Sequence, residues 1–403
     1  MKKEVVIVGG GPSGLATSAC LNLLSIPNVI LERENCYNSL WKKRSYDRLK
    51  LHLAKEFCNL PHFPHPKSSP TYIPKDAFIK YVDDYVSHFN LNPLCCKYVE
   101  SASYDEETKT WRVMSKDTNT GEVDEYIAKF LVVAIGENAE GYIPDVPGLE
   151  SFHGSVLHSS QYKSGSKYKG DAALVVGCGN SGMEIAFDLA NYGAKTSISV
   201  RSAYEFVQFH VVPKEVIHMG MVLLKYLPLK FVDTAVNLFR GLLYGDLGKY
   251  GIYRPKDGPF FLKATTGRSP VIDVGTISKI KSGEIQVLPE IKEIRGSEVV
   301  FSDGKSHPFD AIIFSTGYKS TANYWLKDGE HLLNKEGFPK EKFPNHWKGK
   351  NGLYFAGLAR RGLAGVSMDA QNIANDIKKF FSAVVTKASP SNPCPRGSMH
   401  IHK

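Results

Sequence analysis

Two stretches of this 403-residue chain share the same order of a short apolar run, a glycine-rich turn and a second apolar segment. The short runs, at residues 5–8 and 174–176, have the length and the β-branched composition of strands buried on both faces of a parallel sheet. The segments after the turns, at residues 15–21 and 183–189, have the pattern of buried helices. Strands that alternate with helices in this way predict an α/β fold with two Rossmann-like domains.

Both turns carry the G-x-G-x-x-G spacing of a dinucleotide-binding loop. The first glycine permits a tight turn, the second lets the backbone approach a pyrophosphate, and the third lets the helix pack on the strand. The pyrophosphate then binds at the helix N-terminus. One copy is a weak signal, but two copies in matching contexts predict two bound dinucleotides. The residues assigned to them are Gly9, Gly11, Pro12, Ser13 and Gly14 in the first loop, and Gly177, Gly179, Asn180, Ser181 and Gly182 in the second.

The strands after the two loops end in different residues and predict different ligands. The first ends in Glu32, followed by Arg33, near the offset at which a carboxylate bonds the ribose hydroxyls of an adenosine. This favours FAD or NAD. The second is followed by Arg201 and Ser202, and a cation at this place suits a 2′-phosphate. We therefore predict an NADPH site there, although a solvated surface arginine is the alternative interpretation.

The second loop opens well inside the sequence, which predicts that the NADPH-binding domain is inserted into the FAD-binding domain. Three other apolar runs end in glycines where the chain would leave a sheet, at Gly136, Gly317 and Gly357. The predicted FAD-binding domain comprises residues 1–165 and 300–385. The predicted NADPH-binding domain comprises residues 166–299 with an aromatic-rich insert at about 204–265, and a disordered tail is expected at 386–403.

Composition excludes several classes of function. The chain is 42% hydrophobic and 23% charged, as in ordinary globular proteins. Its net charge of +9 is not concentrated in a dense Lys/Arg block, so we predict anionic small ligands and no nucleic acid as partners. The most apolar stretch, residues 219–244, is interrupted by charged residues and a proline. We therefore predict no transmembrane segment, although contact with a membrane surface is compatible with this stretch.

Seven cysteines are scattered along the chain without a C-x-x-C pair. This pattern is typical of a reducing compartment and predicts neither a disulfide framework nor a metal site. A strand-like run begins almost at the first residue, which leaves no room for a targeting peptide. We therefore expect a cytoplasmic protein, at most peripheral to the endoplasmic reticulum. The oligomeric state is not indicated.

A segment between the two loops identifies a family. Residues 152–163 match F-x-G-x-x-x-H-x-x-x-[YF]-[KP], the identifying sequence of class B flavin monooxygenases, at every specified position. Over residues 1–385 the chain resembles the YUCCA-type flavin monooxygenases of plants, which act on indole-3-pyruvate. The blocks that carry this resemblance lie at residues 39–44, 49–58, 136–138, 270–276, 316–320 and 346–349.

The resemblance implies an activity and its cofactors. NADPH would reduce FAD, and the reduced flavin would capture O₂ as a C4a-(hydro)peroxide. This species would convert indole-3-pyruvate, an aromatic 2-oxo acid, to indole-3-acetate and CO₂ in auxin biosynthesis. The resemblance also implies FAD contacts by Leu40, Trp41, His52, Gly136, Thr316, Gly317 and Gly357, and NADPH contacts by Tyr162, Lys163, Gly317 and Tyr318.

The chain departs from the family pattern at a few positions. Ile135 stands where the first linker motif usually has threonine, which removes a hydroxyl from the interdomain region. Ser315 replaces an alanine, a small change that we expect to be tolerated. His52 stands where many related monooxygenases have an asparagine near the flavin, and it fits a hydrogen-bonded core histidine equally well.

The sequence assigns no catalytic residue firmly, and the two candidates are His52 and Lys55. A 2-oxo acid needs an apolar slot with one cation for its carboxylate. We expect residues 204–261 to form the slot, or to be only a packed helical pair. Lys55, Arg254 or Lys256 would supply the charge.

Three other functions stay open at this point. A flavin disulfide reductase also has two nucleotide domains, but it needs a reactive cysteine pair, and the adjacent Cys95 and Cys96 lie far from either loop. An enzyme that oxygenates nitrogen or sulfur in another small molecule would carry the same cofactor motifs. A sensor that binds both nucleotides without turnover is the third alternative.

Overall fold

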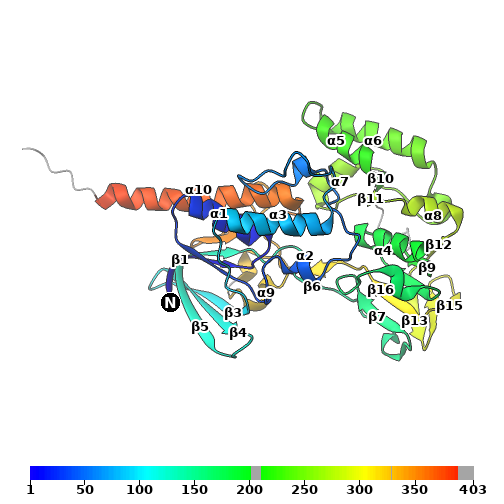
Figure 1. Ribbon diagram of the computed structural model, residues 1–403, viewed down its shortest axis with the longest axis horizontal. Helices are drawn as coiled ribbons and strands as arrows, with labels where there is room; N and C mark the ends of the chain where they lie inside the picture. Colours follow the sequence, from blue (N-terminus) through cyan, green and yellow to red (C-terminus); the bar gives the residue numbers. More distant parts are fainter. Residues whose placement is uncertain (201–209, 328, 389–403) are drawn as a thin grey trace, which may run out of the picture.

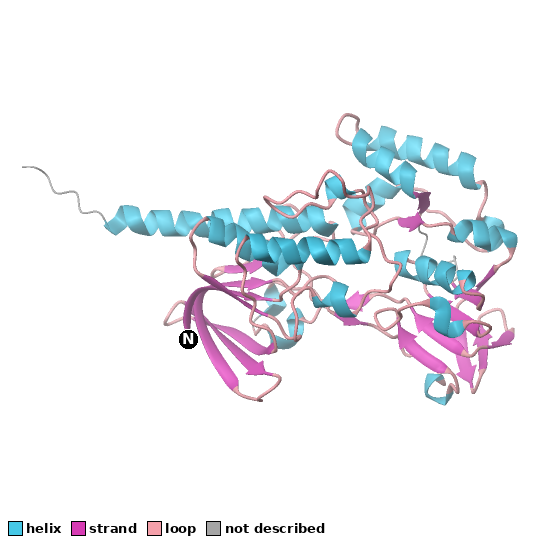
Figure 2. Ribbon diagram, in the orientation of Figure 1, coloured by secondary structure: helices cyan, strands magenta, loops and turns pink. Residues whose placement is uncertain are grey.

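The computed structural model describes residues 1–200, 210–327 and 329–388, and these form two α/β domains side by side (Figure 1). In each domain, one central parallel strand of the sheet is followed by a glycine loop and a helix. Figure 2 shows the two groups of strands separately, with helices above both. The predicted fold class, two Rossmann-like dinucleotide-binding domains, is confirmed.

The first domain has a six-stranded sheet in the order β2-β1-β5-β4-β3, with β18 paired to β5. Its parallel part comprises β1 (Lys2–Val8), β2 (Asn28–Leu31), β5 (Val123–Val133) and β18 (Leu353–Phe355), and its antiparallel part comprises β3 (Lys97–Asp105) and β4 (Thr110–Asp117).

Alternate side chains of β1 face opposite layers, as expected for a strand buried on both sides. Val5 and Ile7 pack toward α1 (Pro12–Leu23), α3 (Lys75–His88) and α10 (Gly362–Ala388), which lie along one face (Figure 1). Val6 and Val8 pack toward α9 (Ala322–Trp325) on the other face. This double burial explains why the strand reads as a continuous apolar run.

The second domain has a five-stranded, wholly parallel sheet in the order β12-β9-β8-β16-β7. The strands are β7 (Ser155–His158), β8 (Ala172–Val176), β9 (Lys195–Ser199), β12 (Ile285–Leu288) and β16 (Ala311–Phe314). Helices α4 (Asn180–Asn191) and α8 (Thr276–Ser282) pack on it, and β13 (Ile291–Arg295), β14 (Glu298–Phe301) and β15 (Ser306–Pro308) form a small antiparallel sheet beside it.

This topology corrects the predicted domain boundaries. Strands β7 and β16 lie in residues that the sequence prediction assigned to the FAD-binding domain, yet both belong to the second sheet. Ala311 pairs with Ser155 on one side and with Ala173 on the other. The pairing joins segments far apart in the chain, so no local pattern could indicate it.

The predicted insert is a helical layer at the upper edge of the second domain (Figure 1). It contains β10 (Val211–Pro213), α5 (Lys214–Leu223), α6 (Leu229–Tyr244), η4 (Gly248–Tyr250) and α7 (Pro259–Thr266), and β10 pairs with β11 (Val271–Asp273). Helix α6 buries Val232 and Val236 but exposes Phe231 and Leu242. The apolar residues of α6 therefore face both inward and outward, and the aromatic slot stays a prediction.

Short elements complete the chain. At the junction of the domains β6 (Glu140–Gly141) pairs with β17 (Tyr318–Lys319). The others are α2 (Ser39–Lys43), η1 (Lys55–Phe57), η2 (Leu149–Ser151), η3 (Gly165–Tyr168) and η5 (Gly329–His331). Helix α10 includes the first three residues of the predicted tail, and the rest of that tail lies outside the described residues. Within the described part of the chain, no helix has both the length and the apolar character needed to cross a membrane.

Candidate nucleotide and active site

The first glycine loop connects β1 to α1, and the three glycines of its G-x-G-x-x-G motif are required for different reasons. Gly9 has φ +113°, and a β-carbon there would lie 2.5 Å from the carbonyl oxygen of Ala134. A β-carbon on Gly14 would lie 1.9 Å from the carbonyl oxygen of Gly9. At Gly11 no heavy atom lies within 4 Å of this position. The protein itself therefore needs Gly9 and Gly14, whereas Gly11 leaves space that a ligand can use.

The second loop, between β8 and α4, repeats this division. Gly177 has φ +104°, and a β-carbon there would lie 2.7 Å from the carbonyl oxygen of Ser315. A β-carbon on Gly182 would lie 1.9 Å from the carbonyl oxygen of Gly177, and Gly179 again has no neighbour within 4 Å. The side chain of Asn180 accepts a hydrogen bond from Ile272 N at 2.7 Å, which ties this loop to β11. Both loops thus have the geometry of dinucleotide-binding turns.

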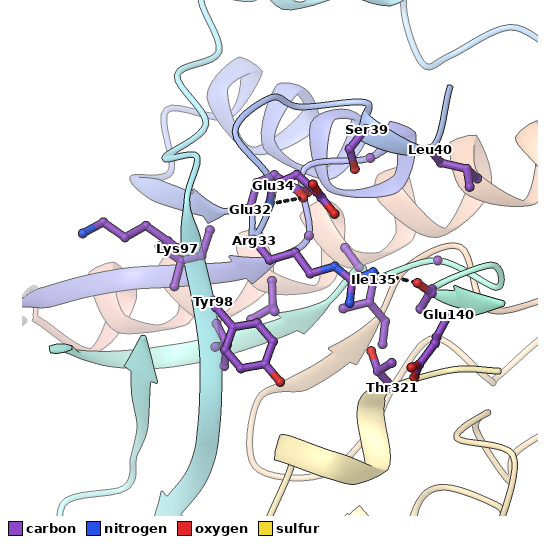
Figure 3. Close-up of a pocket in the computed structure, with 18 of the residues that line it drawn as sticks. Glu32, Arg33, Glu34, Ser39, Leu40, Lys97, Tyr98, Ile135, Glu140 and Thr321 are labelled. Atoms are coloured by element: carbon purple, nitrogen blue, oxygen red, sulfur yellow. Dashed lines mark hydrogen bonds between the residues drawn. The ribbon is translucent and has the colours of Figure 1, made fainter. Parts of the chain in front are cut away.

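A cavity of about 880 Å³ opens on the first loop (Figure 3). Its volume lies in the range of pockets that hold cofactors. The lining includes most of the residues predicted to contact FAD, namely Gly9, Gly11, Pro12, Ser13, Glu32, Arg33, Leu40 and Gly136. Ile135, the residue in place of the usual threonine, lies in the same wall. The residues present therefore fit a bound dinucleotide at this loop.

Glu32 is hydrogen-bonded through its carboxylate to the backbone of the first glycine loop. Its side chain is 5% exposed and accepts hydrogen bonds from Gly10 N at 2.6 Å and Glu34 N at 2.9 Å. Burial raises the pKa of the Glu32 carboxyl, and the two N–H donors act in the opposite direction. Because a carboxylate has about four acceptor positions, it retains capacity for a ribose hydroxyl.

Sequence reasoning missed part of the cavity wall. Arg33, which was predicted, and Arg44, which was not, both donate to the carbonyl oxygen of Ala139, at 2.7 and 3.2 Å. Lys43 forms an ion pair with Glu34 at 2.9 Å. The resemblance block at residues 39–44 already contained Lys43 and Arg44. Ser39, Glu137 and Asn138 also line the cavity and lie in the resemblance blocks. No signal in the sequence indicated Lys97, Tyr98, Asn119, Thr321 and Trp325, which complete this part of the lining.

Other predicted FAD contacts lie outside the described cavity lining, and they stay predictions. The ring of Trp41 packs on Phe78 with centroids 4.5 Å apart. Gly357 N donates to the buried carboxylate of Asp369 at 2.9 Å. The hydroxyl of Thr316 donates to the carbonyl oxygen of Tyr142, at the interdomain junction. The backbone at Gly317 takes part in the same junction, since His158 Nε2 lies 3.0 Å from its carbonyl oxygen.

The predicted NADPH contacts beyond the loop have intramolecular partners in the structure. Tyr162 is 1% exposed, and its hydroxyl donates to Asp188 at 2.7 Å. The ammonium of Lys163 donates to the carbonyl oxygens of Lys43 and Ser45. The NADPH contacts of these two side chains stay predictions. The ring of Tyr318 contacts His158 edge-on, with centroids 4.9 Å apart. Arg201 and Ser202 lie outside the described residues.

The two catalytic candidates lie in different surroundings. His52 Nε2 lies 3.3 Å from the carboxylate of Glu184 on α4 in the second domain. The ammonium of Lys55 donates to three carbonyl oxygens, those of Pro66, Lys67 and Ser69. An ammonium has three N–H donors, so the structure does not support Lys55 as the cation for a substrate carboxylate. Of the other predicted cations, Arg254 and Lys256 are exposed.

Comparison with known proteins decides the family. The flavin-binding monooxygenase-like family model matches residues 2–359. Probable indole-3-pyruvate monooxygenase YUCCA10 of Arabidopsis thaliana is 54% identical over 385 residues, which cover 95% of this chain and 99% of that protein. This chain belongs to the YUCCA family of flavin-binding monooxygenases. Indole-3-pyruvate monooxygenase YUCCA6 of the same plant is 46% identical over 93% of this chain and 90% of its own length.

A solved structure agrees with the fold. The flavin-containing monooxygenase from Stenotrophomonas maltophilia superposes with a TM-score of 0.69 at 20% identity, covering 94% of this YUCCA family member and 99% of that chain. Family membership confirms the predicted enzyme class, an FAD-dependent monooxygenase that uses NADPH. It decides against the disulfide reductase and the sensor that the sequence had left open.

Proposed function

We propose that this protein is an indole-3-pyruvate monooxygenase. In the reaction, indole-3-pyruvate, O₂, NADPH and one proton give indole-3-acetate, CO₂, NADP⁺ and water. The observation that carries the proposal is the 54% identity to a relative named for this activity, over nearly the whole of both chains. The family model covers residues 2–359, a range that includes both loops that would hold the cofactors.

Within this proposal each glycine loop holds one cofactor. FAD occupies the 880 Å³ cavity, with its pyrophosphate at the space beside Gly11 and its adenosine ribose at Glu32. NADPH lies at the matching space beside Gly179. Bound FAD supplies a hydride acceptor and the activation of O₂. The protein holds both nucleotides and shields the reacting atoms from water.

The substrate carboxylate needs a cation, and Arg254 and Lys256 are the remaining predicted candidates. Both lie on the exposed segment between η4 and α7. The proposal includes the cytoplasmic location expected from the sequence, in which seven scattered cysteines without a C-x-x-C pair are typical of a reducing compartment. It includes no nucleic acid partner.

A substrate panel tests the choice of substrate. The FAD-loaded protein receives NADPH, air and catalase with indole-3-pyruvate, with phenylpyruvate, or with a tertiary amine and a thioether. We expect kcat/KM for product formation to be highest with indole-3-pyruvate. Efficient formation of an N-oxide or a sulfoxide, with no indole-3-acetate, would replace this proposal with the nitrogen- or sulfur-oxygenating alternative.

A further inference from the structure

Three side chains of the segment 46–52, whose backbone is hydrogen-bonded to residues 73–75 at the start of α3 in the first domain, converge on one carboxylate of the second domain. The hydroxyl of Tyr46 donates to Glu184 Oε2 at 2.8 Å, and His52 Nε2 lies 3.3 Å from the same oxygen. The guanidinium of Arg48 lies 3.8 Å from the other oxygen. Glu184 is 4% exposed, so this charge is almost fully removed from water. A buried carboxylate with these partners is costly to leave unpaired.

The next turn of the same helix makes a second set of contacts. Asp188 lies four residues after Glu184 and therefore on the same face of α4. Its Oδ2 accepts hydrogen bonds from the hydroxyl of Tyr162 at 2.7 Å and from Gly165 N at 2.8 Å. The guanidinium of Arg48 lies 3.7 Å from Oδ1 and also stacks on the ring of Phe187. One arginine of the first domain thus contacts both carboxylates and the aromatic residue between them.

The helix that receives these contacts also carries the second glycine loop at its N-terminus. Gly179 is the residue before α4, and Asn180 is its first residue. Glu184 follows four residues later, about 6 Å along the helix axis at 1.5 Å per residue. Because a single helical turn separates the two, any shift of α4 relative to the first domain moves the nucleotide loop by a similar amount.

We propose that Glu184, held by Tyr46 and His52, is a positioning residue that fixes α4 against the first domain and so sets how the nicotinamide ring meets the flavin. The inference rests on the proposed assignment of FAD to the first loop and NADPH to the second. Hydride transfer requires the reacting atoms to be in contact, and a displacement near 1 Å can cost about 100-fold in rate. Glu184 and its partners are not residues of the glycine loop, so we expect their loss to lower the rate of hydride transfer more than the affinity for NADPH.

The test uses variants that change one group each. Tyr46→Phe removes only the hydroxyl that donates to Glu184, and Glu184→Gln removes the charge while keeping the shape of the side chain. Tyr192→Phe is the matched control, because Tyr192 follows α4 as its C-terminal cap and is 46% exposed. Each FAD-loaded protein is mixed anaerobically with NADPH, and the limiting rate of flavin reduction is followed at the absorbance of oxidised flavin.

We expect Tyr46→Phe and Glu184→Gln each to lower the limiting reduction rate at least tenfold. The dissociation constant of NADP⁺, measured by calorimetry, should change by less than threefold. The double variant should be little slower than the slower single variant, since both changes break one contact. Tyr192→Phe should match the wild type. Limiting reduction rates within twofold of the wild type in both variants would overturn the inference. A higher dissociation constant of NADP⁺ with an unchanged limiting rate would overturn it as well.

A second measurement does not depend on turnover. Hydrogen exchange of residues 180–191 in the FAD-loaded protein without NADPH should become faster in Tyr46→Phe and Glu184→Gln, but not in Tyr192→Phe. Unchanged exchange in both variants would also contradict the inference. If NADPH fails to reduce the flavin of the wild type, the proposed function falls, and the exchange measurement alone decides whether this contact holds α4.

Discussion

The two glycines with open space beside them offer a sharp test of which loop binds which cofactor. Gly11 and Gly179 have φ of −80° and −70° with extended ψ, which alanine adopts without strain. Neither has a heavy atom within 4 Å of the position that a β-carbon would take. Gly11→Ala and Gly179→Ala should therefore fold normally. Because alanine restricts the unfolded chain, each protein without cofactors should even gain about 0.4–1 kcal/mol in unfolding free energy.

The cost of each substitution should appear only when the nucleotide binds. A methyl group in the open space keeps the pyrophosphate from the backbone N–H donors of the loop. Losing one hydrogen bond to a charged group costs about 1.5–3 kcal/mol. This corresponds to about a 10- to 150-fold rise in the dissociation constant. We expect that rise for FAD in Gly11→Ala and for NADPH in Gly179→Ala.

The assay combines three measurements on each variant. Urea denaturation without cofactors gives the unfolding free energy, flavin fluorescence gives the dissociation constant of FAD, and initial rates at saturating FAD give the KM for NADPH. Gly14→Ala is the contrasting variant, because its methyl group would lie 1.9 Å from the carbonyl oxygen of Gly9 and should destabilise the protein itself. Wild-type FAD affinity in Gly11→Ala would refute the reasoning, and exchanged effects of the two variants would reverse the assignment of the loops.

Further predictions concern specificity, acid stability and the core. Arg201→Ala should raise the KM for NADPH more than that for NADH, and equal effects would discard the 2′-phosphate assignment. Burial lowers the pKa of His158 below the usual 6.5, so its contribution to stability is complete above pH 6.5 and is lost as pH falls through the folded-state value. His158→Gln should therefore flatten the fall in unfolding free energy below pH 6.5 relative to wild type, and parallel curves in urea titrations would contradict this. Asp369→Ala should lower the unfolding free energy by about 3–5 kcal/mol, because it removes the fully buried hydrogen-bond partner of His346 and Gly357 N. A urea midpoint within error of that of the wild type would contradict this.

The parts of the fold that depend on neighbouring residues were predictable from the sequence. Strand, loop and helix follow one another within about 20 residues at each nucleotide site. Their apolar runs and glycines therefore carry the whole signal. Glu32 was predicted for the same reason, since it comes at the end of the next strand. Its carboxylate accepts a hydrogen bond from Gly10 N.

The parts that depend on distant pairing were not predictable. Strand β16 joins the second sheet through β7 and β8, and each partner is more than 130 residues away in the chain. The hydroxyl of Tyr46 donates a hydrogen bond to Glu184, which lies 138 residues further along the chain. Lys55 shows the same limit: its charge suggested a substrate contact, and only the fold shows that its ammonium donates to three carbonyl oxygens of a nearby loop. Residue type alone could not distinguish these outcomes.

The coupling of NADPH oxidation to product formation tests the proposed activity most directly. NADPH oxidation that is not coupled to substrate releases hydrogen peroxide, which itself decarboxylates 2-oxo acids. The FAD-loaded protein must therefore be assayed with excess catalase, which removes the peroxide. Under these conditions we expect close to one indole-3-acetate per NADPH consumed, with one oxygen atom from ¹⁸O₂ in its carboxylate. NADPH consumption with no indole-3-acetate once catalase is present would contradict the account.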